Sequence, residues 1–394
     1  MYRLRRQLCI WTQGCRFVIY YLEFYAGEQA PLCCKSVIWK GEGKTMKMIK
    51  GMDISTLLEE EACGAKYYDF GEEADLLDIL KRYGVNSVRL RLWNDPYDEQ
   101  GNPYGAGTND LDKTICMAKR AKASGMGFLL DYHYSDFWAD PGKQIVPKAW
   151  QGYGPEQLEE AVYEYTVSTM TVLREAGVAP TMVQVGNELT NGLLWPTGQK
   201  PNFDQLAKYI NAGIRGVREV DDQVKIMIHL DNGGFNEMYV EWFDHFMERG
   251  EDFDVIGLSY YPFWHGTLDQ LEYNMRDLAK RYQKELVVAE VSMGFTMEDY
   301  RDREGDPDKR LKGMATKPEL VENLEYPMTP KGQADFMEDI MRLRNIPGAD
   351  EVIASSPYCV QDAASLAGNW QSIFPQKQPL HIEIGMGKGQ FIMD

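Results

Sequence analysis

The chain has 394 residues, of which 44% are hydrophobic and 26% charged, enough for a large buried core in one α/β domain. Its formal net charge of −18 and pI near 4.8 argue against nucleic acid or a membrane surface as a partner, because both attract basic proteins. A neutral polysaccharide is compatible with this charge. The seven cysteines show neither a disulfide framework nor the spacing of a zinc site.

The N-terminal stretch 1–45 has a basic start and an apolar run broken by charges such as Arg16 and Glu23, so it is a poor signal peptide and no membrane span. Lys40–Thr45, directly before Met46, is rich in Lys, Glu and Gly, whose codons are purine-rich like bacterial ribosome-binding sites. We therefore hypothesise that translation starts at Met46, which would make the protein cytoplasmic. The alternative is a degenerate secretion signal and a secreted protein.

From Ile49 onward, short apolar runs alternate with amphipathic stretches, the pattern of repeated βα units. The predicted strands are Lys50–Ile54, Ser87–Leu92, Gly127–Tyr132, Met182–Gly186, Lys225–His229, Val255–Tyr260 and Leu286–Ala289. The predicted helices are Glu72–Tyr83, Leu111–Ser124, Pro155–Ala176, Phe203–Glu219, Asn236–Glu248, Leu268–Gln283 and Pro330–Arg344. Seven such units predict an α/β fold of the (β/α)8 TIM barrel type, with an atypical eighth strand and C-terminal tail. The alternative, a doubly wound sheet, lacks its glycine-rich phosphate turn after the first strand.

Two glutamates stand at the ends of short apolar runs, Glu188 after TMVQVGN and Glu290 after ELVVA. The carboxyl ends of strands are where barrel enzymes place their chemistry. Other predicted strand ends are also polar or aromatic, among them Asp53, Arg89, Arg91, Asp131, His133, Asn187, His229, Tyr260 and Tyr261. Because an unpaired buried charge is costly, we expect these side chains to converge on a solvated cleft.

This pair suits retaining glycoside hydrolysis, which needs two carboxyl groups about 5 Å apart, one protonated and one ionised. Asn187, beside Glu188, suits a hydrogen bond to the sugar 2-hydroxyl. Tyr260 or Tyr261, together with an arginine, would hold Glu290 ionised, because a nearby positive charge lowers a carboxyl pKa. Glu188 would need the opposite shift.

Seven segments carry a family resemblance: GMDIS at 51–55, SVRLRLWNDP at 87–96, FLLDYHYSDFWADPGKQ at 128–144, PKAW at 147–150, VQVGNELTNGLLWPTG at 183–198, SYYPFWHGTL at 259–268 and VVAEVS at 287–292. Their order and length make the chain resemble the endo-β-1,4-galactanases of glycoside hydrolase family 53, in the retaining clan A of (β/α)8 barrels. The resemblance covers roughly residues 49–345.

The resemblance implies that Glu188 is the acid/base, Glu290 the nucleophile and Asn187 the contact to the 2-hydroxyl. Further substrate contacts are expected from Arg89, Arg91, Asp131, His133, Tyr260, Tyr261 and His265. Stacking surfaces for galactose rings are expected from Trp93, Trp138, Trp195, Phe263 and Trp264, although packing is an equal alternative for Trp93 and Trp138. The two arginines lie two positions apart and share a strand face, so the sequence does not choose between them.

The implied activity is retaining endo-hydrolysis of β-1,4-galactan side chains of pectin, without an organic cofactor. One alternative is another clan A specificity, for mannan or xylan, and another is an inactive carbohydrate-binding barrel. The acidic segment 294–313 is a calcium candidate, but its intervening basic residues favour a solvated charge run. The sequence leaves the oligomeric state open.

The resemblance ends before the C-terminus. The family's eighth strand carries a Tyr-Trp-Glu-Pro-type motif, which residues 349–394 lack. Val352–Ala354 is a poor candidate strand, and Trp370 is the only tryptophan there. We therefore expect a doubtful extension over 1–45, a catalytic barrel over 46–348 and an atypical tail after it.

Overall fold

Seven parallel strands form one continuous sheet in the computed structural model, which describes residues 49–297, 318–322, 324–343, 382–384 and 391–393. The strands are β1 (Gly51–Asp53), β4 (Ser87–Leu92), β5 (Gly127–Tyr132), β6 (Met182–Val185), β7 (Lys225–Leu230), β8 (Val255–Tyr260) and β9 (Glu285–Val291). They pair in the order β1-β4-β5-β6-β7-β8-β9, so each new strand is added beside the previous one, as in a barrel.

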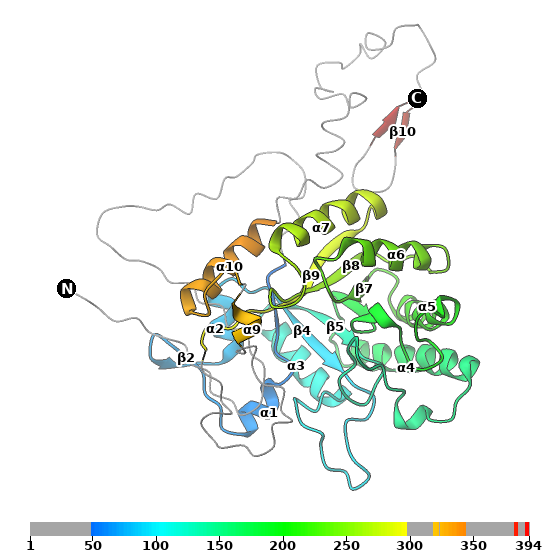
Figure 1. Cartoon of the computed structure of the whole chain (residues 1–394). Helices are drawn as coiled ribbons and strands as arrows, with labels where there is room; N and C mark the ends of the chain where they lie inside the picture. The colour runs from blue at the N-terminus through cyan, green and yellow to red at the C-terminus, as the bar shows by residue number, and fades with distance from the viewer. Residues whose placement is uncertain (1–48, 298–317, 323, 344–381, 385–390, 394) are drawn as a thin grey trace, which may run out of the picture. The chain divides into compact units, whose positions relative to one another are not determined.

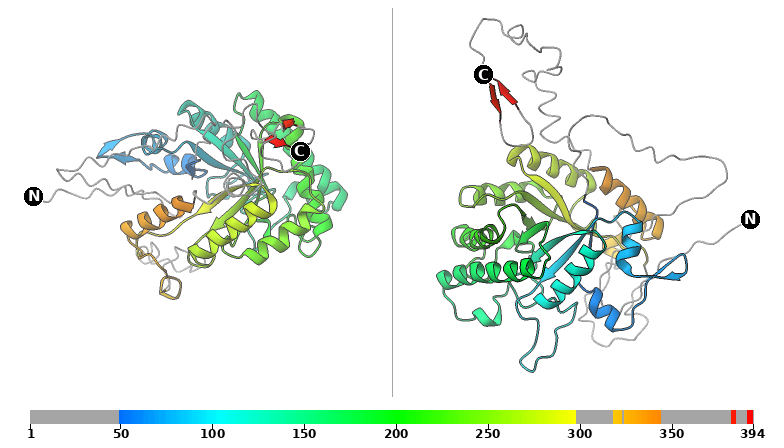
Figure 2. Two further views of the ribbon diagram at one scale, coloured as in Figure 1. Left: turned by 90° about the horizontal axis from the view of Figure 1, so that it is seen from above. Right: turned by 180° about the vertical axis from the view of Figure 1, so that it is seen from behind.

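Helices connect the strands and cover the outer side of the curled sheet (Figures 1 and 2). The longer ones are α2 (Leu76–Arg82), α3 (Leu111–Ala123), α4 (Pro155–Glu175), α5 (Phe203–Val220), α6 (Asn236–Met247), α7 (Leu268–Tyr282) and α10 (Pro330–Arg342). Short elements are α1 (Leu57–Ala62), the hairpin strands β2 (Tyr68–Asp69) and β3 (Glu72–Glu73), the 3-10 turns η1 (Lys148–Trp150) and η2 (Leu189–Asn191), and α9 (Pro318–Val321). Parallel strands curled into a half-barrel with helices between them are the arrangement of the predicted (β/α)8 fold.

The predicted strands and long helices are all present, with small shifts at their ends, but the predicted start of the first helix is wrong. Residues 72–73 instead pair with Tyr68–Asp69 in a hairpin, and α2 begins at Leu76. The side chain of Asp75 accepts the Leu77 N–H at 2.8 Å, a typical N-cap that marks where the helix starts. The sequence interpretation also missed α1.

The interior of the sheet has an apolar floor directly below the polar strand ends. Leu129, Met182, Met227 and Val255, from four consecutive strands, form a cluster separate from the main core between sheet and helices. Strand side chains alternate between faces, so the residues two positions further along point to the same interior. These are Asp131, Gln184, His229 and Gly257, and the chemistry-bearing side chains therefore stand one layer above the floor.

Several expectations concern residues outside the described ranges. They are the extension 1–45, most of the acidic segment 294–313, the candidate strand Val352–Ala354, Trp370 and most of the tail. The chain divides into two units, residues 1–346 and 347–394, and the described residues of the second form β10 (Ile382–Ile384) and β11 (Phe391–Met393), which pair antiparallel. Over the described part of the chain, we find no helix with both the length and the apolar character needed to span a membrane.

We expect Trp242→Ala, on α6, to reduce the free energy of unfolding by about 3–5 kcal/mol, because it empties a large buried site. Trp242 is fully buried, packs on Phe243 and Phe246, and donates a hydrogen bond from Nε1 to the Leu189 carbonyl at 3.1 Å. Urea unfolding followed by circular dichroism measures the loss. Tyr273→Ala is the matched control, since Tyr273 is 63% exposed and its removal should change stability by less than about 0.5 kcal/mol. Equal losses in both variants would contradict this account of the core.

Candidate active site

The turn after β6 presents the first carboxyl group. Gly186 has a φ of 83°, and two residues later Glu188 adopts φ 48° and ψ 60° at the start of η2. A left-handed conformation is uncommon for a residue other than glycine and tends to occur at functional sites. The Trp242–Leu189 hydrogen bond fixes this turn from the side of α6.

A β-bulge presents the second carboxyl group. Leu258 of β8 pairs with Val288 of β9, whereas the next residue, Ser259, pairs with Glu290, so Ala289 has no partner. A bulge changes the direction in which the following side chain points, and bulges are common beside active sites. Here it sets Glu290 opposite Ser259.

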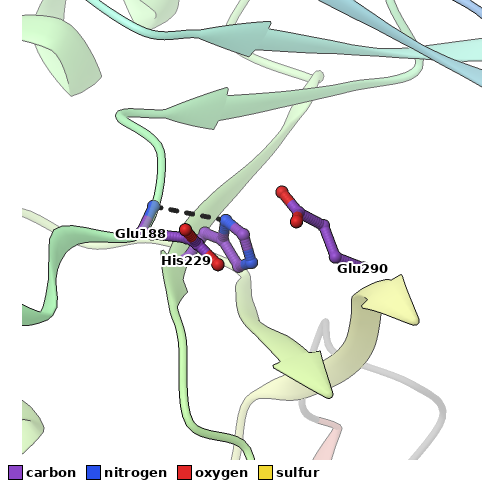
Figure 3. A group of neighbouring side chains, drawn as sticks. All are labelled: Glu188, His229 and Glu290. Carbon is purple, nitrogen blue, oxygen red and sulfur yellow. Dashed lines mark hydrogen bonds between the residues drawn. The ribbon is translucent and has the colours of Figure 1, made fainter. Parts of the chain in front are cut away.

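The two carboxyl groups lie close together. One carboxylate oxygen of Glu188, one of Glu290 and a ring nitrogen of His229 all lie within 4.8 Å of one another (Figure 3). This matches the separation of about 5 Å in retaining glycosidases. Three such groups could in principle surround a cation, but both ring nitrogens of His229 are already engaged in hydrogen bonds. We therefore interpret the carboxyl groups as a catalytic pair rather than as metal ligands.

The surroundings shift the pKa values of the two carboxyl groups in opposite directions. Burial alone would raise the pKa of Glu290, but Arg89 Nη1 donates to its Oε1 at 2.9 Å and the Tyr261 hydroxyl donates to its Oε2 at 2.7 Å, and together they hold the pKa well below its usual range. Burial raises the pKa of Glu188 well above its usual range, and the negative charges of Glu290 and Asp231 raise it further. Opposite shifts in a carboxyl pair are the pattern of a nucleophile and a general acid.

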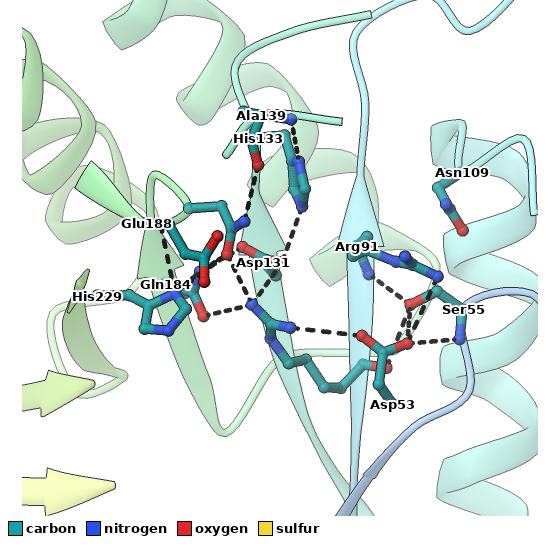
Figure 4. A network of polar contacts seen from close by, with 12 residues as sticks. Asp53, Ser55, Arg91, Asn109, Asp131, His133, Ala139, Gln184, Glu188 and His229 are labelled. Carbon is teal, nitrogen blue, oxygen red and sulfur yellow. Dashed lines mark hydrogen bonds and ion pairs between the residues drawn. The ribbon is translucent and has the colours of Figure 1, made fainter. Parts of the chain in front are cut away.

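The guanidinium group of Arg89 connects Glu290 to the strands around it. Its partners Asp53, Asp131 and Gln184 are labelled in the polar network of Figure 4. Its Nη2 lies 2.9 Å from Asp131 Oδ2 and donates to Asn187 Oδ1 at 2.9 Å and to Gln184 Oε1 at 3.1 Å. Its Nη1 also lies 3.5 Å from Asp53. The cation is thus surrounded by acceptors from β1, β5, β6 and β9, which offsets the cost of burying it.

Asp131, which the sequence predicted as a substrate contact, lies against Arg89 and not against the carboxyl pair. It lies 3.0 Å from His133 Nε2, while His133 Nδ1 accepts the Ala139 N–H at 3.0 Å. Because Nδ1 accepts, Nε2 carries the hydrogen and donates it to Asp131. His133 is buried and belongs to this supporting layer, not to the substrate contacts for which it was predicted.

The structure shows which of the two arginines and which of the two tyrosines contact Glu290, a choice that the sequence left open. Arg89 contacts Glu290, whereas the guanidinium of Arg91 stacks at 4.0 Å over the ring of Trp138. Tyr261 contacts Glu290, whereas Tyr260 is buried, packs on Phe336 of α10 and donates to the Gly266 carbonyl. The prediction of Tyr260 as a site residue is therefore corrected, because neighbouring strand residues point to opposite faces.

The predicted aromatic surfaces divide in a similar way. Trp93 is fully buried among Phe137, Trp138 and His133, so it is a packing residue and not a stacking surface. Trp264 is 43% exposed, so its ring is available as a stacking surface. Its ring centroid lies 5.8 Å from that of Tyr261, the residue that contacts Glu290. The ring of Phe263 packs on that of Trp264.

Trp195 lines a separate cavity of about 390 Å³ between the loops at 142–153 and 195–197. His265 is buried and accepts the Tyr261 N–H at 3.2 Å, which fixes the loop after β8.

Three residues that hydrogen-bond to the groups around the carboxyl pair were not among the predicted substrate contacts. Gln184 donates to Asp131 and accepts from Arg89, Ser259 donates to Glu188 at 2.7 Å, and His229 Nε2 lies 2.9 Å from the Ser259 hydroxyl. Gln184 interrupts an otherwise apolar strand, and His229 and Ser259 stand near strand ends, so polar residues on inward strand positions were the available signal.

A barrel-like parallel sheet that gathers, at its strand ends, one carboxyl group of raised pKa and one of lowered pKa defines a glycoside hydrolase. The sequence profile of glycosyl hydrolase family 53 matches residues 49–352, and the chain belongs to this family.

Relatives and solved structures agree with this membership. The endo-β-1,4-galactanase of Bacillus subtilis (strain 168) is 40% identical, covering 77% of this chain and 67% of the relative. The arabinogalactan endo-β-1,4-galactanase of Thermothelomyces thermophilus is 35% identical, covering 75% and 84%. The solved family 53 catalytic domain from Ignisphaera aggregans is 43% identical with a TM-score of 0.70, covering 75% of this chain and 80% of that one. These matches show that the half-barrel of the described residues has the (β/α)8 TIM barrel fold.

We expect Arg89→Met to move the acid limb of the kcat/KM profile to higher pH by about 1–3 pH units, because removing the adjacent cation raises the pKa of Glu290. Initial rates over a range of pH measure the shift. Arg89→Lys keeps the charge and should move the limb less. Arg91→Met is the matched control that leaves the limb in place, because Arg91 does not contact Glu290. An unshifted limb in Arg89→Met would contradict the proposed electrostatic role.

Proposed function

We propose that this protein is a retaining endo-β-1,4-galactanase that hydrolyses galactan side chains of pectin, with Glu188 as the acid/base and Glu290 as the nucleophile. The observation that carries the proposal is the close approach of these two carboxyl groups, within 4.8 Å, in surroundings that shift their pKa values in opposite directions. The galactan specificity rests on the names of the relatives, which are endo-β-1,4-galactanases at 35–40% identity.

In the first step, the ionised carboxylate of Glu290 attacks the anomeric carbon and displaces the leaving sugar. Glu188 gives its proton to the departing glycosidic oxygen, so that a covalent glycosyl-enzyme forms and Glu188 becomes ionised. Arg89 and Tyr261 keep Glu290 unprotonated before attack. The raised pKa of Glu188 keeps a proton available at neutral pH.

In the second step, the ionised Glu188 takes a proton from water as the oxygen of that water attacks the anomeric carbon. The bond to Glu290 breaks, and both groups return to their starting states. Asn187 donates one amide hydrogen to the Ala139 carbonyl at 2.9 Å, and its second hydrogen is suited to the sugar 2-hydroxyl. The cycle uses two carboxyl groups and water, and we propose no organic cofactor for it.

Two alternative functions give different outcomes in the substrate test below. The carboxyl pair is common to clan A, so mannan or xylan would be attacked by the same chemistry if the subsites differ. A binding protein without turnover is the other alternative, because the tail lacks the eighth-strand motif of the family.

Incubation of the full-length chain with linear β-1,4-galactan, mannan and xylan in parallel tests the substrate. We expect new reducing ends from galactan alone. Release from mannan or xylan instead would change the assigned specificity. Galactan binding without reducing ends would identify a binding barrel and contradict the proposal.

We expect Glu188→Ala to lower kcat on galactan by about 10²–10⁴-fold, because the leaving sugar then departs without a proton. A small anion such as azide should restore turnover of an aryl glycoside in this variant and give a β-glycosyl azide, identified by proton NMR. Glu290→Ala should lose turnover without azide rescue to the β-product, yet still bind galactan. A β-azide product from Glu290→Ala, or an unaffected Glu188→Ala, would refute the assigned roles.

A further inference from the structure

Ser259 and His229 form a buried hydrogen-bonded pair beside the proposed acid/base, and the two catalytic steps do not yet use them. Both residues are fully buried. His229 Nε2 lies 2.9 Å from Ser259 Oγ, and Ser259 Oγ lies 2.7 Å from Glu188 Oε1. The direction in which hydrogens are donated along this chain decides which oxygen of Glu188 is free to carry a proton.

The backbone of Glu188 fixes this direction. Its N–H points at His229 Nδ1 at 3.4 Å (Figure 3), and the amide nitrogen of Gln184 lies 3.1 Å from the same ring nitrogen. A main-chain N–H can only donate, so Nδ1 must offer its lone pair. Burial lowers the pKa of His229 to about 4, so the ring is neutral and its single hydrogen sits on Nε2.

One acceptor also lies near Nδ1, but it receives hydrogens from other donors. Asn187 Oδ1 is 3.0 Å from His229 Nδ1. The same oxygen accepts from Arg89 Nη2 at 2.9 Å and lies 3.0 Å from the Gln184 amide nitrogen. It therefore needs no hydrogen from His229.

The hydroxyl of Ser259 has one hydrogen to donate. With His229 donating to its oxygen, that hydrogen goes to Glu188 Oε1. Among the described residues, no donor contacts the other oxygen of Glu188, Oε2.

We propose that His229 and Ser259 are positioning residues that keep Oε1 of Glu188 occupied as an acceptor and so confine its acidic proton to Oε2, where it reaches the leaving group. This inference rests on the proposed role of Glu188 as acid/base. In glycosylation the O–H bond at Oε2 breaks and the proton moves to the glycosidic oxygen. In the second step Oε2 takes a proton from the attacking water, while the Ser259 hydrogen stays on Oγ.

Ser259 also affects the pH dependence of the reaction, through the pKa of Glu188. Burial raises the pKa of Glu188, the negative charges of Glu290 and Asp231 raise it further, and Arg89 lowers it. The other titratable groups around it are His229, which is neutral, and Tyr239 and Tyr261, whose own pKa values are raised by burial and then by nearby negative charges, that of Glu188 among them. The Ser259 hydroxyl also lowers the pKa of Glu188, because it donates to the ionised form. Its removal therefore raises the pKa of Glu188 and moves the alkaline limb of kcat/KM upward.

Ser259→Ala tests the proposed role of the Ser259–His229 pair on two substrates. On galactan we expect kcat/KM to fall roughly tenfold and the alkaline limb to rise by roughly one pH unit. On a dinitrophenyl β-galactobioside, whose leaving group needs no proton, kcat/KM should change less than about twofold. Thr169→Ala is the matched control, because it removes another buried hydroxyl, bonded to Tyr132 at 2.6 Å. Equal losses on both substrates, or an unmoved alkaline limb, would overturn the proposal.

The tautomer of His229 supplies a second test, which leaves Ser259 in place and so also serves if Ser259→Ala does not fold. In ¹⁵N-histidine-labelled protein, with the signal assigned by its loss in His229→Gln, we expect the Nε2–H tautomer both in the wild type and in Glu188→Gln. An Nδ1–H tautomer, or a change between the two proteins, would overturn the proposed direction. Failure of the galactanase function would appear separately, as a wild-type chain that releases no reducing ends from galactan.

Discussion

The buried guanidinium group of Arg89 is the constraint on which the site depends. A cation at this depth is tolerated only if acceptors surround it, and side chains from several strands provide them, with Asp131 and Glu290 as the closest anions. The same charge holds Glu290 ionised. The ionised Glu290 in turn raises the pKa of Glu188, so one buried cation sets the protonation of both carboxyl groups, directly for one and indirectly for the other.

The layered arrangement of side chains inside the sheet places the acceptors that the buried Arg89 cation needs. On β5, β6 and β7 the inward positions are apolar at one level and polar at the next, so the network rests on an apolar floor formed by Leu129, Met182, Met227 and Val255. An apolar floor keeps the local dielectric low, which strengthens every charge interaction above it. Two local departures from regular strand geometry orient the carboxyl groups. The left-handed turn at Glu188 orients the first, and the bulge at Ala289 orients Glu290.

The sequence predicted the strands because most are short runs rich in β-branched and aliphatic residues, and β4, β6 and β8 are buried on both faces. It predicted the two glutamates because they end such runs. The same double burial is why Tyr260 and Tyr261 could not be separated, since no polar–apolar alternation marks the inward face. Arg89 and Arg91 share that face and differ only in height along the barrel, which a sequence pattern does not measure. The Ser259–His229 pair depends on side-chain contacts between strands and was equally out of reach.

The left-handed backbone of Glu188 has a consequence for how this enzyme can change over time. A side chain costs about 1 kcal/mol or more in that conformation, and glycine does not bear this cost. Glu188→Gly would relieve the backbone and also remove a buried carboxyl group from beside Glu290. Drift toward greater stability would therefore remove one member of the carboxyl pair, and the proposed acid/base role of Glu188 gives the reason why selection keeps a glutamate there.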